Sequence, residues 1–205
     1  MGNPAQDFEA AFWGDCSNTF YEERKHYVYA SLMGIKRQHW DFVVPEHSHI
    51  LDIGAGPASM LLKTRGAKRR VVTDPLQYPA WVYLRYAMTG IEALHDPGET
   101  VIERFQNVLD GGHKPFDEVW IYNCLQHVED PKLIIRNAMT LGRRVRIFEW
   151  IDLPPHDGHP HMLTASSLDE WLDEGSNENW SGGDVTVLSH DGCFGRAYSA
   201  VRGVL

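Results

Sequence analysis

Short apolar runs alternate with helical segments through the middle of this sequence, and no other feature constrains the fold as strongly. Each run spans four or five residues and ends at turn-forming or polar residues, which is typical of buried strands. Strands are expected at 49–53, 70–73, 91–95, 119–122 and 145–148. Helices are expected at 58–65, 78–89, 99–108, 131–141 and 166–172. Strands that alternate with helices predict βαβ units, and therefore an α/β fold whose doubly wound sheet has five parallel strands.

The C-terminal part of the chain departs from this alternation. Residues 185–189 and 197–201 are two further strand-like runs, and the segment 191–195 between them contains glycine. A short glycine-containing connection is typical of neighbouring antiparallel strands. We therefore expect a terminal antiparallel hairpin in addition to the parallel strands.

The N-terminal part of the chain has a helical pattern. Over residues 1–40 apolar side chains recur three and four positions apart, as with Phe8 and Phe12. The length of 205 residues suits one domain with a small addition. We expect an N-terminal helical cap over residues 1–44 and a sheet domain over residues 45–205.

Charge and composition argue against several classes of protein. The formal net charge is −9 at pH 7 and the basic residues are scattered, so a nucleic-acid partner is disfavoured. The three cysteines are far apart, which favours a reducing compartment over a disulfide framework. There is no signal-peptide pattern and no apolar run of the ~20 residues that cross a membrane. We expect a cytoplasmic protein; its oligomeric state stays open.

A glycine-rich segment after the first predicted strand gives the strongest indication of a binding site. It contains Asp52, Gly54 and Gly56. Glycine lets the chain turn sharply and lets a ligand approach the backbone, and ligands bind at the carboxyl ends of parallel strands. The pattern also suits a dinucleotide. However, Ser59 replaces the third glycine of the dinucleotide pattern, and the Asp52 carboxylate favours a cationic ligand over a pyrophosphate.

A second acidic residue, Asp74, directly follows the second predicted strand, 22 residues after Asp52. An acidic side chain at this place binds ribose hydroxyls in nucleotide-binding folds. Asp74 can also be a turn residue before Pro75. Because the glycine-rich segment lies upstream, we favour the ribose contact.

Four motifs occur in an order that is typical of a known family. They are residues 52–56 (DIGAG), 72–75 (VTDP), 116–119 (FDEV) and 123–131 (NCLQHVEDP). Over residues 48–170 the chain resembles the class I S-adenosylmethionine-dependent methyltransferases, especially the small-molecule branch related to the ubiquinone and menaquinone methylases. The resemblance implies a Rossmann-like fold and S-adenosyl-L-methionine as the cofactor.

The resemblance also implies which residues bind the cofactor. Those expected at its methionine end are Asp52, Gly54, Ala55, Gly56 and Asn123. Those expected at its ribose and adenine are Asp74, Pro75, Leu76 and Glu99. Asp96 is an alternative to Glu99, because the local spacing is irregular. An N-terminal helical cap often covers the cofactor in this family.

Histidines follow two of the predicted strands and are candidates for a general base. His127 comes after the fourth strand, while His159 and His161 belong to the segment 156–161 after the fifth. A neutral histidine accepts a proton near pH 7. Glu149 is a further candidate. The segment 156–161 can instead form a substrate lid; because its spacing matches no standard zinc pattern, we expect no metal.

These observations predict an S-adenosylmethionine-dependent methyltransferase that transfers a methyl group to a small-molecule acceptor by in-line displacement. Such an enzyme mainly has to align the acceptor with the S–CH₃ bond and exclude water. One alternative is an NAD(P)-dependent oxidoreductase or epimerase, for which a parallel sixth strand is expected in place of the hairpin. The other is a non-catalytic module that binds S-adenosylmethionine. The sequence does not identify the acceptor.

Overall fold

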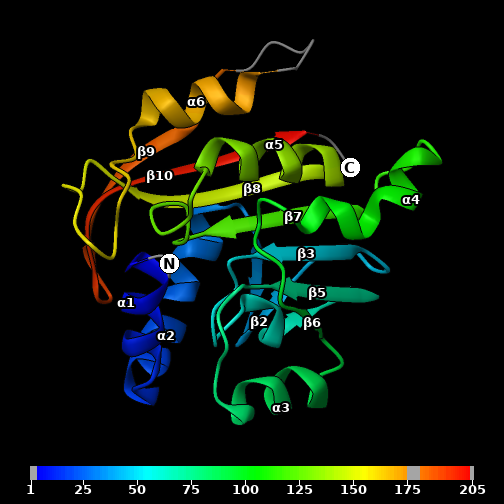
Figure 1. Cartoon of the computed structure of the whole chain (residues 1–205), viewed down its shortest axis with the longest axis horizontal. Helices are drawn as coiled ribbons and strands as arrows, with labels where there is room; N and C mark the ends of the chain where they lie inside the picture. The colour runs from blue at the N-terminus through cyan, green and yellow to red at the C-terminus, as the bar shows by residue number, and fades with distance from the viewer. Residues whose placement is uncertain (1–3, 175–180, 204–205) are drawn as a thin grey trace.

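The computed structural model describes residues 4–174 and 181–203, and its centre is a seven-stranded sheet (Figure 1). The strand order is β6-β5-β3-β7-β8-β10-β9. The strand bounds are β3 His49–Ile53, β5 Arg69–Thr73, β6 Glu92–Leu94, β7 Phe116–Tyr122, β8 Gly142–Ile151, β9 Asp184–His190 and β10 Cys193–Gly203. The first five strands in this order are parallel, while β10 runs antiparallel to both β8 and β9. The predicted parallel sheet and terminal antiparallel hairpin are confirmed.

The hairpin closes in a tighter turn than the predicted segment 191–195. His190 pairs with Cys193, so the turn consists of Asp191 and Gly192. Both turn residues have positive φ, 53° and 77°, as a type I′ turn requires, and an Asp-Gly pair favours that turn. Cys193 and the residues after it therefore belong to β10.

Helices cover both faces of the sheet (Figure 1). Their bounds are α1 Pro4–Trp13, α2 Cys16–Leu32, the 3-10 helix η1 Met60–Lys63, α3 Ala80–Met88, the 3-10 helix η2 Val101–Phe105, α4 Gln106–Asp110, α5 Pro131–Leu141 and α6 Ala165–Asp173. α2 and α3 pack on one face, and α5 and α6 on the other. The helices predicted at 78–89, 131–141 and 166–172 are confirmed within two residues at each end. Among the described residues, no helix combines the length and apolar character needed to cross a membrane.

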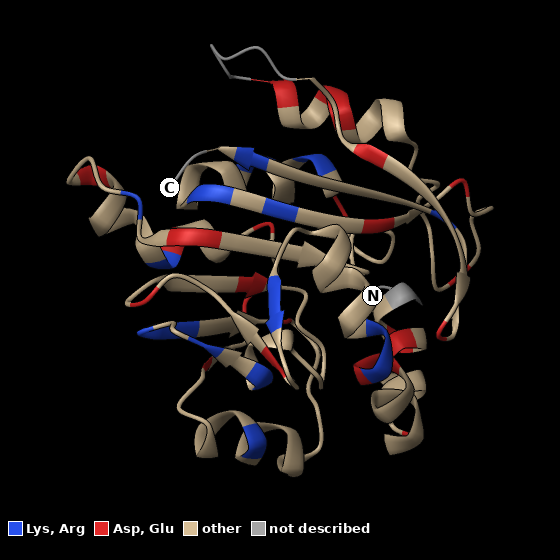
Figure 2. Cartoon of the chain, turned by 180° about the vertical axis from the view of Figure 1, so that it is seen from behind, with Lys and Arg blue, Asp and Glu red and all other residues tan. Residues whose placement is uncertain are grey.

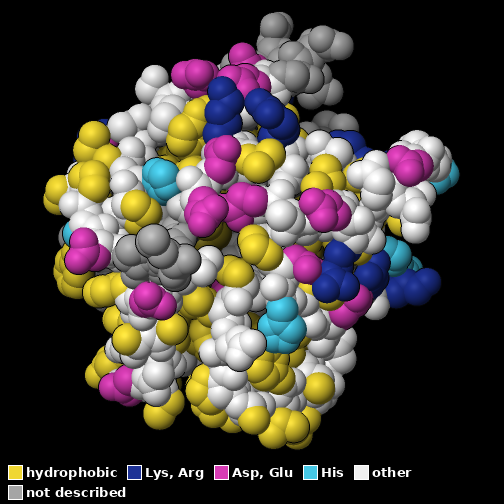
Figure 3. Space-filling model, in the orientation of Figure 1, with side chains coloured by type: hydrophobic (Ala, Val, Ile, Leu, Met, Phe, Trp, Pro, Cys, Tyr) yellow, Lys and Arg dark blue, Asp and Glu magenta, His cyan; other side chains and the backbone are white. Residues whose placement is uncertain are grey.

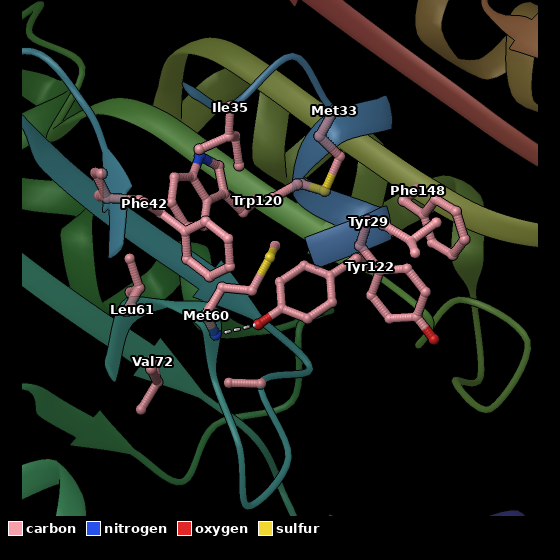
Figure 4. Packing of buried hydrophobic residues seen from close by; sticks show 14 of the residues in the cluster. Tyr29, Met33, Ile35, Phe42, Met60, Leu61, Val72, Trp120, Tyr122 and Phe148 are labelled. Carbon is pink, nitrogen blue, oxygen red and sulfur yellow. Dashed lines mark hydrogen bonds between the residues drawn. The ribbon is translucent and has the colours of Figure 1, made fainter. Parts of the chain in front are cut away.

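Of the N-terminal helices, α2 packs directly against the centre of the sheet. Tyr29 stacks on Phe148 of β8 with ring centroids 4.1 Å apart, and Met33 is fully buried in the same cluster (Figure 4). The expectation of helix throughout residues 1–40 is wrong at its end. The chain turns at Gly34, where φ is 67°, and continues into a strand. Glycine adopts this left-handed conformation without a steric penalty.

A second, three-stranded sheet was not predicted. It consists of β1 (Lys36–Gln38), β2 (Asp41–Val43) and β4 (Thr64–Arg65). Strands of two or three residues are too short to show the alternation by which a strand is recognised in sequence. The domain division at residue 44 stays a prediction; this sheet joins segments from both sides of it.

The helix predicted at 58–65 is wrong. The chain forms the four-residue η1 and then enters β4, which pairs with β2. Two tyrosine hydroxyls accept backbone N–H groups at this point. Ser59 N donates to Tyr86 Oη at 3.1 Å, and Met60 N donates to Tyr122 Oη at 2.9 Å (Figure 4). These bonds and the strand pairing satisfy backbone groups without an α-helix.

A buried ion pair connects β7 and β8 with the end of α2. Glu118 accepts two hydrogen bonds from Arg146, at 2.7 and 3.0 Å, and one from Trp120 Nε1 at 2.8 Å. Arg146 also donates to the Met33 carbonyl at 2.6 Å. Burial raises the pKa of Glu118, but the hydrogen bonds and charge of Arg146 outweigh it and lower the pKa. Figure 2 shows basic residues of β8 beside acidic residues of β7. The pair therefore attaches the N-terminal segment to the sheet.

We expect Glu118→Ala to lower the free energy of unfolding by about 3–5 kcal/mol, because it leaves Arg146 buried without its counter-charge. The free energy of unfolding should fall by less in a double variant with Glu118→Leu and Arg146→Met, because this variant removes both charges. Urea unfolding at pH 7, followed by circular dichroism, measures both changes. Equal losses in the single and double variants would contradict this explanation.

Candidate functional site

A cavity of about 230 Å³ lies at the carboxyl ends of β3, β5 and β7. The helices α1 and α2 contribute the wall on the other side. The predicted site residues that line the cavity are Gly54, Ala55, Gly56, Asp74, Pro75, Leu76, Glu99, Asn123 and His127. The structure thus brings together most of the predicted cofactor residues. In Figure 3, acidic side chains gather on the outer surface over the end of β7 and the start of α5.

Glycine is needed at two positions in the loop after β3, for a different structural reason at each. Both have positive φ, 71° at Gly54 and 58° at Gly56. A Cβ at Gly54 would lie 2.6 Å from the Cys124 side chain, so this glycine allows the loop to pack on the segment after β7. A Cβ at Gly56 would meet no atom within 4 Å. Gly56 therefore leaves backbone open towards the cavity, where a ligand can approach it.

Asp74, directly after β5, holds the loop that contains Gly56. Its Oδ2 accepts a hydrogen bond from Gly56 N and its Oδ1 accepts one from Leu76 N, both at 3.0 Å. Burial raises the pKa of Asp74 to about 6. Each carboxylate oxygen keeps further capacity to accept hydrogen bonds. Asp74 is therefore fixed in position and able to accept hydrogen bonds from ligand hydroxyls.

Asp52 does not belong to the cavity lining. Its carboxylate is fully buried behind the glycine loop, where Oδ2 accepts hydrogen bonds from Ser59 Oγ at 2.5 Å and Tyr122 Oη at 2.6 Å. Burial raises the pKa of Asp52 to about 7. In this structure Asp52 fixes the path of the chain after the loop. Its predicted contact with a bound cofactor stays a prediction.

Asn123, the first residue after β7, connects the sheet with α2. It has a positive φ of 52°, and its Nδ2 donates to Glu22 Oε1 at 3.0 Å. Both side chains line the cavity. A left-handed conformation is uncommon for a residue other than glycine, and asparagine tolerates it better than most. Asn123 thus brings an acidic side chain of the N-terminal region against the end of β7.

Glu149 lies beneath the segment after β7 rather than in the cavity. It is fully buried, and its Oε1 accepts hydrogen bonds from Cys124 N and Leu125 N, both at 3.0 Å. Burial raises the pKa of Glu149 to about 8. The hypothesis that Glu149 acts as a base has no support in this geometry. The side chain instead fixes the backbone next to Asn123.

Glu99 lines the cavity, whereas its alternative Asp96 does not. Glu99 Oε1 accepts hydrogen bonds from Glu129 N at 3.0 Å and Asp130 N at 3.2 Å, which connects the segments that follow β6 and β7. Asp96 forms an ion pair with Arg104. Of the two candidates, the structure places Glu99 at the cavity.

The three histidines proposed as bases have different surroundings. His127 lines the cavity, and its Nδ1 donates to the Gly158 carbonyl at 2.7 Å. The His159 ring lies next to it, with centroids 4.4 Å apart. His161 is turned away, with Nε2 at 2.8 Å from the Val128 carbonyl. Burial lowers the pKa values of His127 and His159 to about 4, so both are neutral near pH 7.

The individual N-terminal residues that line the cavity were not predicted from the sequence. The lining residues from α1 and α2 are Gln6, Glu9, Trp13, Glu22 and His26. The sequence indicated helices there, but helical spacing does not show which face meets the sheet. Acidic residues of the lining are Glu9, Glu22, Asp74, Glu99 and Glu129, and no lysine or arginine of the described chain lines it. The cavity therefore favours a cationic ligand.

We expect Glu149→Gln to become more stabilising as the pH rises. The folded-state pKa of about 8 exceeds the value of 4.5 for a free glutamate. The contribution of Glu149 to the free energy of unfolding is therefore complete below pH 4.5 and is lost as the pH rises through 8. Glutamine can still accept the two backbone N–H groups without a charge. The free energy of unfolding of the variant should exceed that of the wild type by a few kcal/mol at about pH 8.5, but not near pH 4. Urea unfolding across this range measures the difference; a pH-independent difference would count against it.

Neither family models nor curated proteins match this sequence, but solved structures do. The N-methyltransferase NodS from Bradyrhizobium japonicum matches with a TM-score of 0.63 and 14% identity, over 98% of this chain and 97% of that one. A methyltransferase from Thermotoga maritima, described as a possible histamine N-methyltransferase, matches with a TM-score of 0.61 and 12% identity, over 97% and 98%.

The same fold also occurs in a different kind of enzyme. The [4+2]-cyclase SpnF matches with a TM-score of 0.53 and 16% identity, over 73% of this chain and 54% of that one. Likenesses at these identities concern the fold alone. The chain has the class I fold of S-adenosylmethionine-dependent methyltransferases.

Proposed function

We propose that this protein is an S-adenosylmethionine-dependent methyltransferase that acts on a small-molecule acceptor. The observation that carries the proposal is the edge of the cavity where Asp74 bridges Gly56 and Leu76. An acidic side chain after the second parallel strand, beside an open glycine backbone, is suited to ribose hydroxyls. Pro75 and Leu76 continue from it and offer apolar surface for the adenine.

The charge of the cavity favours this cofactor over a dinucleotide. S-adenosylmethionine carries a sulfonium and an ammonium group, and the lining has acidic residues without lysine or arginine. A pyrophosphate instead binds at the N-terminus of an α-helix that follows the glycine loop. Here the loop leads into η1, where the first N–H groups already bond to tyrosine hydroxyls. These features count against an NAD(P)-dependent oxidoreductase or epimerase.

The acceptor is expected on the side formed by α1, α2 and the segment after β7. Glu9, Glu22 and His127 present polar atoms there, while Trp13 adds an aromatic surface. The bound cofactor supplies an activated methyl group. The chain has to hold the acceptor in line with it and keep out water, and such positioning contributes ~7–11 kcal/mol. One structure that matches over nearly the full length is described as a possible histamine N-methyltransferase, and histamine is a small molecule.

We expect S-adenosylhomocysteine to bind and to raise the melting temperature, because a ligand that binds only the folded state stabilises it by mass action. NADH at the same concentration should have no effect. Calorimetric titration of both ligands measures this. Binding of NADH without binding of S-adenosylhomocysteine would contradict the proposed function. Release of S-adenosylhomocysteine from S-adenosylmethionine with a panel of amines, phenols and thiols then separates an enzyme from a non-catalytic module.

Asp74→Asn should weaken binding of S-adenosylhomocysteine by roughly 5- to 150-fold, equivalent to about 1–3 kcal/mol for a charged hydrogen-bonding partner. Asp96→Asn is the matched control, since Asp96 follows β6 but does not line the cavity. Calorimetry gives both affinities, and the melting temperatures without ligand show that each variant is folded. Equal affinities in the two variants would restrict Asp74 to a structural role in the loop.

A further inference from the structure

Three segments that are distant in sequence place metal-binding side chains together beside the cavity. Glu9 comes from α1, His127 follows β7, and His159 follows β8. Each residue offers one potential ligand atom, and these atoms all lie within 4.8 Å of one another. All three side chains are partly buried. The cluster differs from the histidine segment considered in the sequence, because His161 is turned away and Glu9 takes part.

The hydrogen bond of His127 determines which of its ring nitrogens can bind a metal ion. A carbonyl can only accept a hydrogen bond, so the contact with the Gly158 carbonyl places the proton of His127 on Nδ1 and leaves the lone pair on Nε2. A backbone carbonyl commonly fixes a metal-binding histidine in this way.

Glu9 lacks a permanent cationic partner. Its Oε2 accepts a hydrogen bond from Trp13 Nε1 at 2.7 Å, while its Oε1 lies 3.2 Å from His127 Nδ1. Among the described residues, no lysine or arginine forms an ion pair with Glu9. A bound cation would stabilise the ionised form of this carboxyl group.

Hydrogen bonds of the backbone around His159 fix the position of this residue in the cluster. His156 and His159 exchange two backbone hydrogen bonds, at 2.9 and 3.0 Å, and Gly158 N donates to His156 Nδ1 at 3.1 Å. The Phe8 ring of α1 packs on Gly158 so closely that a Cβ there would lie 2.4 Å from it. This contact seats α1 on the turn, and Glu9 is the next residue of the same helix.

We propose that Glu9, His127 and His159 form a binding site for one divalent transition-metal ion at the acceptor side of the cavity. One carboxylate and two imidazoles are a ligand set that zinc, iron and related ions accept, with further positions left for water or a ligand. Because His127 also lines the cavity, an acceptor hydroxyl or amine can reach such a position. A metal ion lowers the pKa of the group it binds.

The direct test is metal binding by the full chain, without any assay of methyl transfer. The protein is treated with a chelator, dialysed and titrated with Zn²⁺ by calorimetry, and with Co²⁺ by visible absorption. We expect about one high-affinity ion per chain. Glu9→Gln and His159→Gln should each weaken it by at least about tenfold. His161→Gln is the matched control from the same segment and should bind as the wild type does.

The outcomes distinguish this proposal from the proposed function. Absence of Zn²⁺ and Co²⁺ binding, or wild-type affinity in both Glu9→Gln and His159→Gln, overturns the metal site. If Glu9→Gln does not fold, the comparison of His159→Gln with His161→Gln decides. Binding of S-adenosylhomocysteine is measured in the same samples. If the chain binds the metal but not S-adenosylhomocysteine, the metal-site proposal is retained and the proposed function is overturned.

Discussion

The fully buried carboxylate of Asp52 organises the binding edge of this protein. It accepts hydrogen bonds from Ser59 and Tyr122, and Tyr122 in turn accepts the N–H of Met60. The hydroxyl groups thus connect the end of β7 with the chain that leaves β3. This network replaces the α-helix that usually follows a glycine loop. If it were removed, the loop would lose the contacts that hold its far end against the sheet.

The parts of the fold that were predictable from sequence are those with local signals. α5 has Asp130 as its N-cap and Pro131 at its first position, and the predicted bounds agree with the structure. η1 was not predictable in this way. Its hydrogen bonds come from Tyr86 and Tyr122, which are 27 and 62 residues away in sequence from the groups they bind. Apolar spacing alone carries no information about such distant partners.

The candidate site, too, was predictable from sequence only where the signals were local. The segments after β3, β5 and β7 were expected to meet, because the ends of neighbouring parallel strands lie at one edge of a sheet. Gly56, Asp74 and Asn123 accordingly line the same cavity. Glu9 and Glu22 were missed, since their position depends on how α1 and α2 dock. His159 and His161 are two residues apart, yet only the first turns towards His127.

The acidic cavity has a consequence for the proposed reaction cycle. The sulfonium charge of S-adenosylmethionine disappears when the methyl group leaves. Carboxylates near the cavity interact more favourably with the charged cofactor than with its neutral thioether product. The protein is therefore expected to discriminate between the two by charge, and release of the product is favoured after transfer.

The attachment of α2 to the far end of the chain constrains the order of folding. Arg146 donates to the carbonyl of Met33 across a sequence separation of 113 residues, and α2 also contacts β10. During synthesis on the ribosome, the N-terminal helices emerge long before the strands that complete their packing. Contacts of such large separation carry a high entropic cost of loop closure and form late. We therefore expect the wall that completes the cavity to assemble late in folding, although its residues are synthesised before the strands on which they pack.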